Sequence, residues 1–324
     1  MKLATYLHNG TSRVGVIDKD YLIDPIAIEQ ATSLLGAEAN CFADMLDVIK
    51  SASTAKRLAE QAIDISRQNN IGRIALADVR LLEPMRPSTI LCAGSNYISH
   101  NAEKASSDTS GKEPEFFIKT MDCIIPHEAS IIHDPILTKK LDGEVELAVV
   151  IGMPGRHIPK ERALEHVFGY TIVNDVTARD RQVRYRPDGS TWYELGRGKV
   201  FDSSAPIGPF IVTTDDLPDP QDLNISSRVN GELRQNSNTS QMIWSVAELI
   251  HVFSTNLTLR AGMVIITGTP SGTAWSTDAE LGGKWSGGNG IVPAKGYLQP
   301  GDVIECKIEK IGLLRNTIVS QSAR

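Results

Sequence analysis

The chain has 324 residues, of which 41% are hydrophobic, so it is long and apolar enough to bury a large core. A formal net charge of -6 and a pI of about 5.7 argue against a nucleic-acid-binding surface, which needs a basic stripe. No apolar stretch approaches the roughly 20 residues that cross a bilayer, and the N-terminus turns polar too early for a signal peptide. We therefore expect a cytoplasmic protein that binds neither nucleic acid nor membranes.

The first part of the chain has the pattern of a small α+β domain. Asn9-Gly10 is a hairpin signal between two strand-like segments, and apolar residues farther on recur at helical spacing. The elements expected here are strands at 2–8, 13–18, 21–24 and 73–84, and helices near 27–38 and 41–69. The sequence Met85-Arg86-Pro87 follows. We place a domain boundary there, which gives a small N-terminal domain, 1–85, and a larger domain, 86–324.

The larger domain is dominated by short apolar strands. Asn230-Gly231 predicts a second hairpin, and Ser245 with Glu248 forms a capping box at the start of a helix. The strands are expected at 89–94, 115–119, 145–152, 170–175, 206–213, 225–231, 263–268 and 302–308, with helices near 159–167 and 245–256. Many strands with few helices between them predict a β-rich α+β fold.

Two glutamates in the sequence LDGEVELAVVIG suggest a metal site. Glu144 and Glu146 are two residues apart, so on a strand both side chains point to the same face. Asp175 ends another apolar strand and is the candidate third ligand. Three carboxylates suit Mg²⁺ or Mn²⁺. The alternative is an edge strand whose acids face water, but LAVVIG is too apolar for an edge. His127 and His133 are more typical of loop residues than of a zinc site.

Several motifs occur together in an order that resembles the fumarylacetoacetate hydrolase family. The resemblance covers roughly residues 85–320 and includes SNYISHNAEK, LDGEVELAVVIG, GYTIVNDVTARDRQ, GRGKVFD, VNGELRQNSNTSQMIWS and ITGTPSG. It implies a mixed β-roll for the catalytic domain and a homodimer. It also implies that Glu144, Glu146 and Asp175 bind Mg²⁺ or Mn²⁺.

The same resemblance implies roles for five further residues. The H-x-x-E pair matches His100 and Glu103, which would activate water, and histidine is the residue type most often used as a general base near neutral pH. Gln182 and Lys199 match residues that contact substrate, and Lys199 is also a catalytic candidate. Thr269 matches a threonine near the substrate carboxylate. Without the resemblance, His100 and Glu103 would be more typical of a solvated surface pair.

Three features lie outside the family pattern or beside its motifs. Lys119-Thr120 stands where the family often has Lys-Pro, and the segment 275–297 is longer and richer in Gly and Trp than usual. Glycine-rich loops often rim sites, so we expect this segment to tune substrate size. Arg179 and Asp180 are expected to form a structural ion pair beside the site.

The function expected from these residues is hydrolysis of a C–C bond in an acylpyruvate-type 2,4-diketo acid, in aromatic or related carbon catabolism. Water activated by His100 and Glu103 would attack the second carbonyl, while Lys199 and Gln182 bind the oxyanions. The alternatives are tautomerisation or decarboxylation of oxaloacetate, and isomerisation of a hydroxymuconate-type dienoate. A non-catalytic module that holds a structural cation is a further alternative. The expected partners are a small 2-keto acid and a second copy of the chain.

Overall fold

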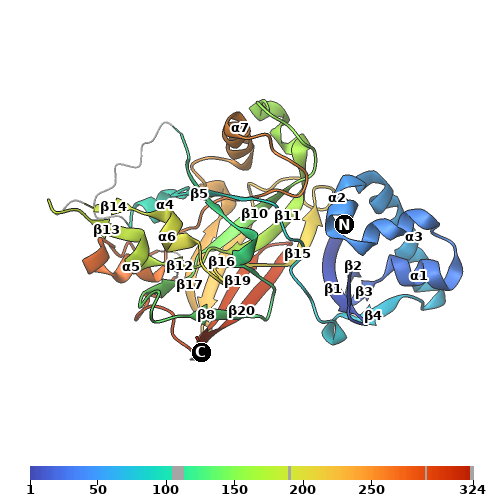
Figure 1. Ribbon diagram of the computed structural model, residues 1–324, viewed down its shortest axis with the longest axis horizontal. Helices are drawn as coiled ribbons and strands as arrows, with labels where there is room; N and C mark the ends of the chain where they lie inside the picture. Colours follow the sequence, from blue (N-terminus) through green and yellow to red (C-terminus); the bar gives the residue numbers. More distant parts are fainter. Residues whose placement is uncertain (104–112, 189–190, 289, 322–324) are drawn as a thin grey trace.

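The computed structural model describes residues 1–103, 113–188, 191–288 and 290–321, and two β-sheets dominate it (Figure 1). In spatial order, the large sheet contains β4 (Arg73–Ala75), β3 (Tyr21–Ile23), β2 (Thr11–Asp18), β1 (Lys2–His8), β15 (Ala205–Thr213), β11 (Val167–Asn174), β10 (Val145–Ile151), β18 (Val264–Ile266), β5 (Ile90–Gly94) and β6 (Glu115–Lys119), with β7 (Ile124–Ile125) beside β15. The small sheet contains β17 (Glu232–Asn238), β16 (Asn224–Val229), β19 (Val303–Ile308), β20 (Gly312–Ser320) and β8 (Ser130–His133). The β-rich α+β fold predicted from the sequence is confirmed.

The first strands are joined by the hairpin that the sequence predicts. His8 pairs with Thr11, and the two turn residues Asn9 and Gly10 have φ values of 47° and 81°. Positive φ at both positions is what a two-residue turn between twisted strands requires. The helical segments that pack on these strands are α1 (Pro25–Thr32), η1 (Ala37–Ala43), α2 (Met45–Lys50) and α3 (Ala52–Asn69), drawn in blue in Figure 1.

The helices and the last strand of this region are shorter than predicted. The helix expected at 27–38 stops at Ser33, which adopts a left-handed conformation with φ of 56°. The helix expected at 41–69 is divided at Ser51, which lies between α2 and α3 with φ of -110° and ψ of 32°. The strand expected at 73–84 has only three residues, because the chain then turns into the 3-10 segment η2 (Leu76–Asp78).

The N-terminal strands continue the sheet of the rest of the chain. β1 pairs antiparallel with β15, with Leu3 opposite Ile211. One hydrophobic cluster contains side chains from both sides of this junction, including Leu3, Val14, Val150 and Ile211. The division into 1–85 and 86–324 stays a prediction, and the two parts share one sheet and one core cluster.

β10 and β11 are buried along their whole length, because apolar side chains cover both faces. One face contacts the small sheet, and the other contacts the cluster that includes the N-terminal helices. Gly169 in β11 lies so close to β15 that an added Cβ would be 2.4 Å from the carbonyl oxygen of Val212. The two strands therefore form a central, buried platform, as expected because LAVVIG is too apolar for an edge strand.

Helix α7 (Val246–Asn256) begins as predicted, with Ser245 and Glu248 forming a capping box. The helix expected at 159–167 is instead the 3-10 segment η4 (Lys160–His166). The remaining pieces are α4 (Ile98–Asn101), η3 (Met121–Cys123), β9 (Leu141–Asp142), β12 (Thr177–Ala178), α5 (Arg179–Gln182), β13 (Val183–Tyr185), β14 (Thr191–Tyr193), α6 (Leu195–Lys199), η5 (Thr239–Gln241), η6 (Ala274–Thr277) and η7 (Ala279–Leu281). Within the described ranges, no helix has the length and hydropathy needed to cross a membrane.

Candidate functional site

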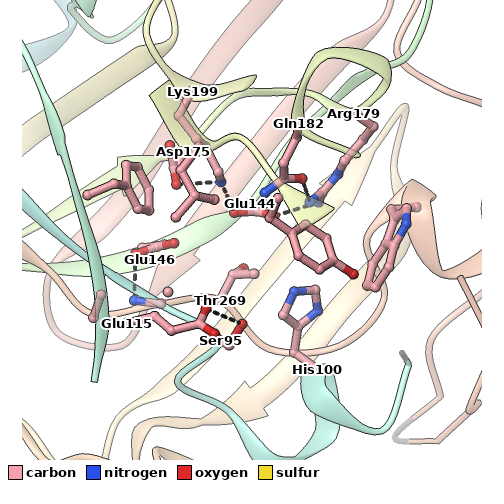
Figure 2. A pocket seen from close by; sticks show the side chains of 17 residues that line it. Ser95, His100, Glu115, Glu144, Glu146, Asp175, Arg179, Gln182, Lys199 and Thr269 are labelled. Carbon is pink, nitrogen blue, oxygen red and sulfur yellow. Dashed lines mark hydrogen bonds and ion pairs between the residues drawn. The ribbon is translucent and has the colours of Figure 1, made fainter. Parts of the chain in front are cut away.

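Two neighbouring strands bring three carboxylates together at their ends. Glu146 is in β10, Glu144 directly precedes that strand, and Asp175 directly follows β11. The backbone N–H of Asp175 donates to the carbonyl oxygen of Glu144 at 2.8 Å, which holds the two residues opposite each other. All three side chains are buried, and one oxygen from each lies within 4.8 Å of the others. Figure 2 shows the three side chains converging on one cavity.

Three buried basic side chains contact two of these acids. Lys199 Nζ donates to Glu144 Oε2 and to Asp175 Oδ2, at 2.6 Å in each case. Arg179 donates to Glu144 Oε1 at 2.5 Å. Lys119 Nζ forms an ion pair with Asp175 Oδ1 at 3.0 Å. These basic side chains therefore neutralise Glu144 and Asp175, and none of them forms an ion pair with Glu146 among the described residues.

The two glutamates differ in their electrostatic surroundings. Burial raises the pKa of Glu144, but attraction to Arg179 and Lys199 outweighs it and lowers the pKa to about 2. Burial raises the pKa of Glu146 well above its usual range, and repulsion from Asp175 and Glu144 adds to this rise. Glu146 is thus the carboxylate of the cluster that is least stabilised as an anion by the protein alone.

These donors fit a hard divalent cation. Three carboxylates offer oxygen ligands to Mg²⁺ or Mn²⁺, and three protein ligands leave coordination positions for water or substrate. Glu146 accepts a hydrogen bond from the backbone N–H of Gly268 at 2.6 Å, and within the described ranges it forms no ion pair. A cation bound between the three acids supplies the positive charge that Glu146 otherwise lacks.

A histidine and a glutamate form a pair on the opposite side of the cavity. His100 Nδ1 lies 3.0 Å from Glu103 Oε2, and the other oxygen of Glu103 accepts from the backbone N–H of Gly272 at 2.7 Å. Both side chains are buried, with 7% and 0% of their surfaces exposed. Because Nδ1 is engaged by Glu103, the ring nitrogen left for proton exchange is Nε2. His100 lies across the cavity from Asp175 and Lys199 (Figure 2).

The cavity between these groups is small, with about 50 Å³ open to water-sized groups. Gln182 lines it, and its side-chain oxygen accepts from Arg179 at 3.0 Å, so its amide nitrogen is left as a donor. Thr269 also lines it, but the hydroxyl of Thr269 donates to the carbonyl oxygen of Val145 at 2.9 Å. Trp275 closes part of the wall.

The family model described as "Fumarylacetoacetate (FAA) hydrolase C-terminal" matches residues 89–319. The chain belongs to the fumarylacetoacetate hydrolase family. The oxaloacetate tautomerase YisK from Bacillus subtilis (strain 168) is 37% identical over 325 residues, which cover 98% of this chain and 100% of that protein. Its family membership makes the chain an enzyme of this family.

Solved structures of the family share the fold along the whole chain. The fumarylacetoacetate hydrolase from psychrophilic Exiguobacterium antarcticum has a TM-score of 0.75 and 35% identity, and the match covers 99% of this chain and 100% of that one. Maleylpyruvate hydrolase from Sphingobium sp. SYK-6, solved with manganese(II) and pyruvate, has a TM-score of 0.72 and 25% identity over 99% of this chain and 100% of that one. The buried acids of this family member are consistent with a divalent metal. The homodimer and the cytoplasmic location stay predictions.

The residues that the sequence predicts for the site lie together. Seven of them line the cavity, namely His100, Glu144, Glu146, Asp175, Gln182, Lys199 and Thr269. Glu103 lies behind His100 and contacts it directly. The individual roles of these residues in catalysis, substrate binding and metal binding stay predictions.

The predicted ion pair between Arg179 and Asp180 is wrong. Neighbouring residues of a helical turn point in different directions, so their side chains do not meet. Arg179 turns into the site and donates to Asp142 at 2.9 Å, in addition to Glu144. Asp180 instead accepts from the hydroxyl of Thr138 and the backbone N–H of Lys139.

The sequence predicts no role for two buried charged residues that hold side chains of the site. Lys119 was noted only as a departure from a Lys-Pro pattern, yet it is fully buried and contacts Asp175. Asp142 was not considered, although it holds Arg179. A signal exists for Asp142, because it precedes Glu144 by two residues and so is a third acid in the same short motif.

Proposed function

We propose that this enzyme interconverts the keto and enol forms of oxaloacetate or a closely related small 2-keto acid, with Mg²⁺ or Mn²⁺ held by Glu144, Glu146 and Asp175. The observation that carries the proposal is the 37% identity to an oxaloacetate tautomerase over 98% of the chain. Tautomerisation thus replaces C–C bond hydrolysis as the first choice.

The protein groups on one side of the cavity suit the 2-keto acid head of the substrate. A bound divalent cation supplies Lewis-acid stabilisation of negative charge on the substrate oxygens. Lys199 holds an ammonium group in a buried position, where its attraction to an anionic oxygen is stronger than in water. Gln182 offers an amide N–H to the same region. Together these donors bind the carboxylate and the 2-oxygen and orient the substrate.

His100 and Glu103, on the opposite side of the cavity, carry out proton transfer. Tautomerisation of the keto form breaks the C3–H bond, forms the C2=C3 double bond and places a proton on the 2-oxygen. His100 Nε2 accepts the C3 proton, and Glu103 holds the ring through Nδ1 and stabilises the imidazolium. The protonated ring then returns the proton at the 2-oxygen, directly or through a water molecule. Atoms and charge balance, and the reverse sequence gives the keto form.

Hydrolysis of a short acylpyruvate is the second candidate. Its support is the same pair of residues, because a histidine held by a carboxylate can also activate water. The maleylpyruvate hydrolase solved with manganese(II) and pyruvate has the same fold at 25% identity. The cavity would then have to admit both the diketo acid and a water molecule.

The two candidates are separated by following substrate and products in parallel. The purified enzyme is mixed with enol oxaloacetate and Mg²⁺ or Mn²⁺, the loss of enol absorbance is recorded, and pyruvate is measured in the same samples. We expect faster loss of the enol without pyruvate formation, and slow or absent cleavage of acetylpyruvate. Cleavage of acetylpyruvate without acceleration of the enol–keto exchange would establish the hydrolase instead. Pyruvate formation from oxaloacetate faster than in a control with the metal ion alone would establish a decarboxylase.

A further inference from the structure

Trp275 packs on two groups of the site at once. Its ring meets the His100 ring edge-on, with centroids 5.8 Å apart and planes inclined by 66°. The guanidinium carbon of Arg179 lies 5.8 Å from the Trp275 ring centroid. Only 2% of the Trp275 surface is exposed, and the side chain lines the cavity. The indole therefore forms the wall that adjoins the proton-transferring histidine.

Directional contacts fix the position of this indole. The backbone N–H of Trp275 donates to Asp142 Oδ2 at 3.0 Å, and the same oxygen accepts from Arg179 Nε. Trp275 Nε1 donates to the carbonyl oxygen of Leu281 at 3.0 Å. Gly283 passes so close that an added Cβ would lie 1.9 Å from the carbonyl oxygen of Trp275. The ring is thus held between the site and the segment that follows it.

The same segment, residues 272–284, which we name the tryptophan loop, also holds the His100–Glu103 pair. Its first residue, Gly272, donates its N–H to Glu103 Oε1 at 2.7 Å, and its last residue, Lys284, donates its N–H to the carbonyl oxygen of Glu103, also at 2.7 Å. Glu103 is therefore bonded to both ends of the loop. Two hydrogen bonds thus link the loop that carries Trp275 to the His100–Glu103 pair.

A cluster on the outer side anchors the tryptophan loop to the rest of the chain. Asp278 accepts from Lys140 Nζ at 2.7 Å and from the hydroxyl of Tyr297 at 2.6 Å. Lys140 also donates to Glu280 at 2.8 Å. Because Lys140 precedes β9, this cluster joins the loop to the strand that carries Asp142. The loop is thus supported both inside and outside the cavity.

From this arrangement we propose that Trp275 determines substrate specificity, by limiting the length of the 2-keto acid that the cavity accepts. The proposal rests on the 2-keto acid function proposed above. We place the carboxylate and 2-oxygen of the substrate at Lys199 and at the metal site formed by the three acids. C3 of the substrate then faces His100, and the group beyond C3 meets the indole ring that packs on His100. A substituent longer than that of oxaloacetate would have to displace the indole, which its hydrogen bonds oppose.

The test uses ligand binding, so that it does not depend on which reaction the enzyme catalyses. Pyruvate, 2-oxobutanoate, 2-oxopentanoate and 2-oxohexanoate are titrated calorimetrically into the full chain with Mg²⁺ present. For the unaltered chain, we expect affinity to fall with length beyond the size of oxaloacetate. In Trp275→Ala, the preference should move toward the longer acids by roughly 10-fold or more, the scale on which added methylene groups are discriminated in a pocket.

A graded variant and a matched control complete the design. Trp275→Leu keeps apolar bulk and should give an intermediate length profile, which also protects the test if the alanine variant does not fold. Trp285→Ala removes a half-buried tryptophan outside the set of residues that line the cavity, and it should leave the profile unchanged. An unchanged profile in both Trp275 variants, with binding retained, overturns the proposal. If no 2-keto acid binds the unaltered chain, the proposed function itself is wrong.

Discussion

Glu146 differs from the other two acids of the cluster in what surrounds it. Its pKa is raised by burial and by two nearby carboxylates, whereas Glu144 is stabilised as an anion by Arg179 and Lys199. A buried carboxylate whose pKa is raised on folding costs stability as the pH rises above its ordinary value of 4.5. In the absence of metal, Glu146 therefore lowers the stability of the fold at neutral pH. A bound cation would offset this cost by attracting the carboxylate.

Replacing Glu146 by glutamine should separate its contribution to metal binding from its cost to the stability of the metal-free fold. We expect Glu146→Gln to weaken Mn²⁺ binding by at least about 100-fold, because loss of a ligand should cost more than the 10–100-fold typical of an outer contact. Activity should fall with it. The metal-free variant should melt at a higher temperature than the metal-free parent at pH 7, and the difference should shrink toward pH 4. Calorimetric titration and thermal melts with a chelator measure both quantities.

Asp175→Asn and Glu161→Gln provide the comparison. Asp175→Asn should also weaken metal binding. It leaves Lys119 without its ion-pair partner, so it should in addition destabilise the metal-free chain. Glu161 is exposed on η4, and its replacement should alter neither metal binding nor activity. Full activity of the parent enzyme in excess chelator would contradict the metal-dependent mechanism.

His100 tests the assignment of proton transfer. His100→Ala should lower kcat for enol–keto exchange by roughly 10²- to 10⁴-fold, the usual contribution of a general acid–base group. Mn²⁺ affinity should change little, because His100 lies across the cavity from the acids rather than among them. His157→Ala, at an exposed position, is the matched control. A variant that binds Mn²⁺ normally and keeps its full rate would show that another group moves the proton.

The capping box of α7 has a pH dependence that belongs to the helix rather than to the site. Partial burial raises the pKa of Glu248, but hydrogen bonds from Lys160 Nζ, Ser245 Oγ and the Ser245 backbone N–H outweigh this and lower the pKa to about 2. A carboxyl group with a lowered pKa in the folded state stabilises the fold above its ordinary value of 4.5. That contribution is lost as the pH falls from about 4.5 to about 2.

Glu248→Ala should therefore reduce the free energy of unfolding by about 1 kcal/mol at pH 7, the usual size of a capping effect. Most of the attraction to Lys160 is screened, since half of that side chain is exposed, so it adds little. The difference from the parent should narrow as the pH falls below 4.5. Urea unfolding at several pH values measures it, with Glu60→Ala as the control for an exposed helical glutamate. A difference that is constant with pH would assign the effect to helix propensity alone.

Elements that depend on adjacent residues could be predicted from the sequence, whereas those that depend on distant partners could not. Both Asn-Gly hairpins and the Ser245 cap are set by residues within a few positions of each other. β8 was not predicted, because it is defined by pairing with β20, about 190 residues later in the chain. The same limit applies to Lys119, whose partner Asp175 lies 56 positions away, directly after another strand. Glu144 and Glu146 could be predicted because their spacing is local.

At the scale of the whole molecule, the N-terminal residues 1–85 contribute to the environment of the central strands without lining the cavity. Figure 1 shows them at one end of the long axis, with β1 beside β15. Their apolar side chains share one core cluster with residues on one face of β10 and β11, and the acids of the site lie at the ends of these two strands. Residues 1–85 thus contribute to the core that holds the central strands in place.

Removing this region should therefore destabilise the fold of residues 86–324. A fragment that begins at residue 86 exposes Val150, Val173 and Ile211 and leaves β15 without its partner β1. Exposed apolar faces and unpaired edge strands promote aggregation. We expect the fragment to melt at a lower temperature than the full chain and to elute as aggregates in size-exclusion chromatography. In the full chain, Leu3→Asp should lower the melting temperature less than the deletion does, because it buries a charge at the junction. Thr11→Asp changes an exposed position and should leave the melting temperature unchanged. A fragment that elutes as a discrete species, melts like the full chain and binds Mn²⁺ equally well would show that residues 86–324 fold as an independent domain.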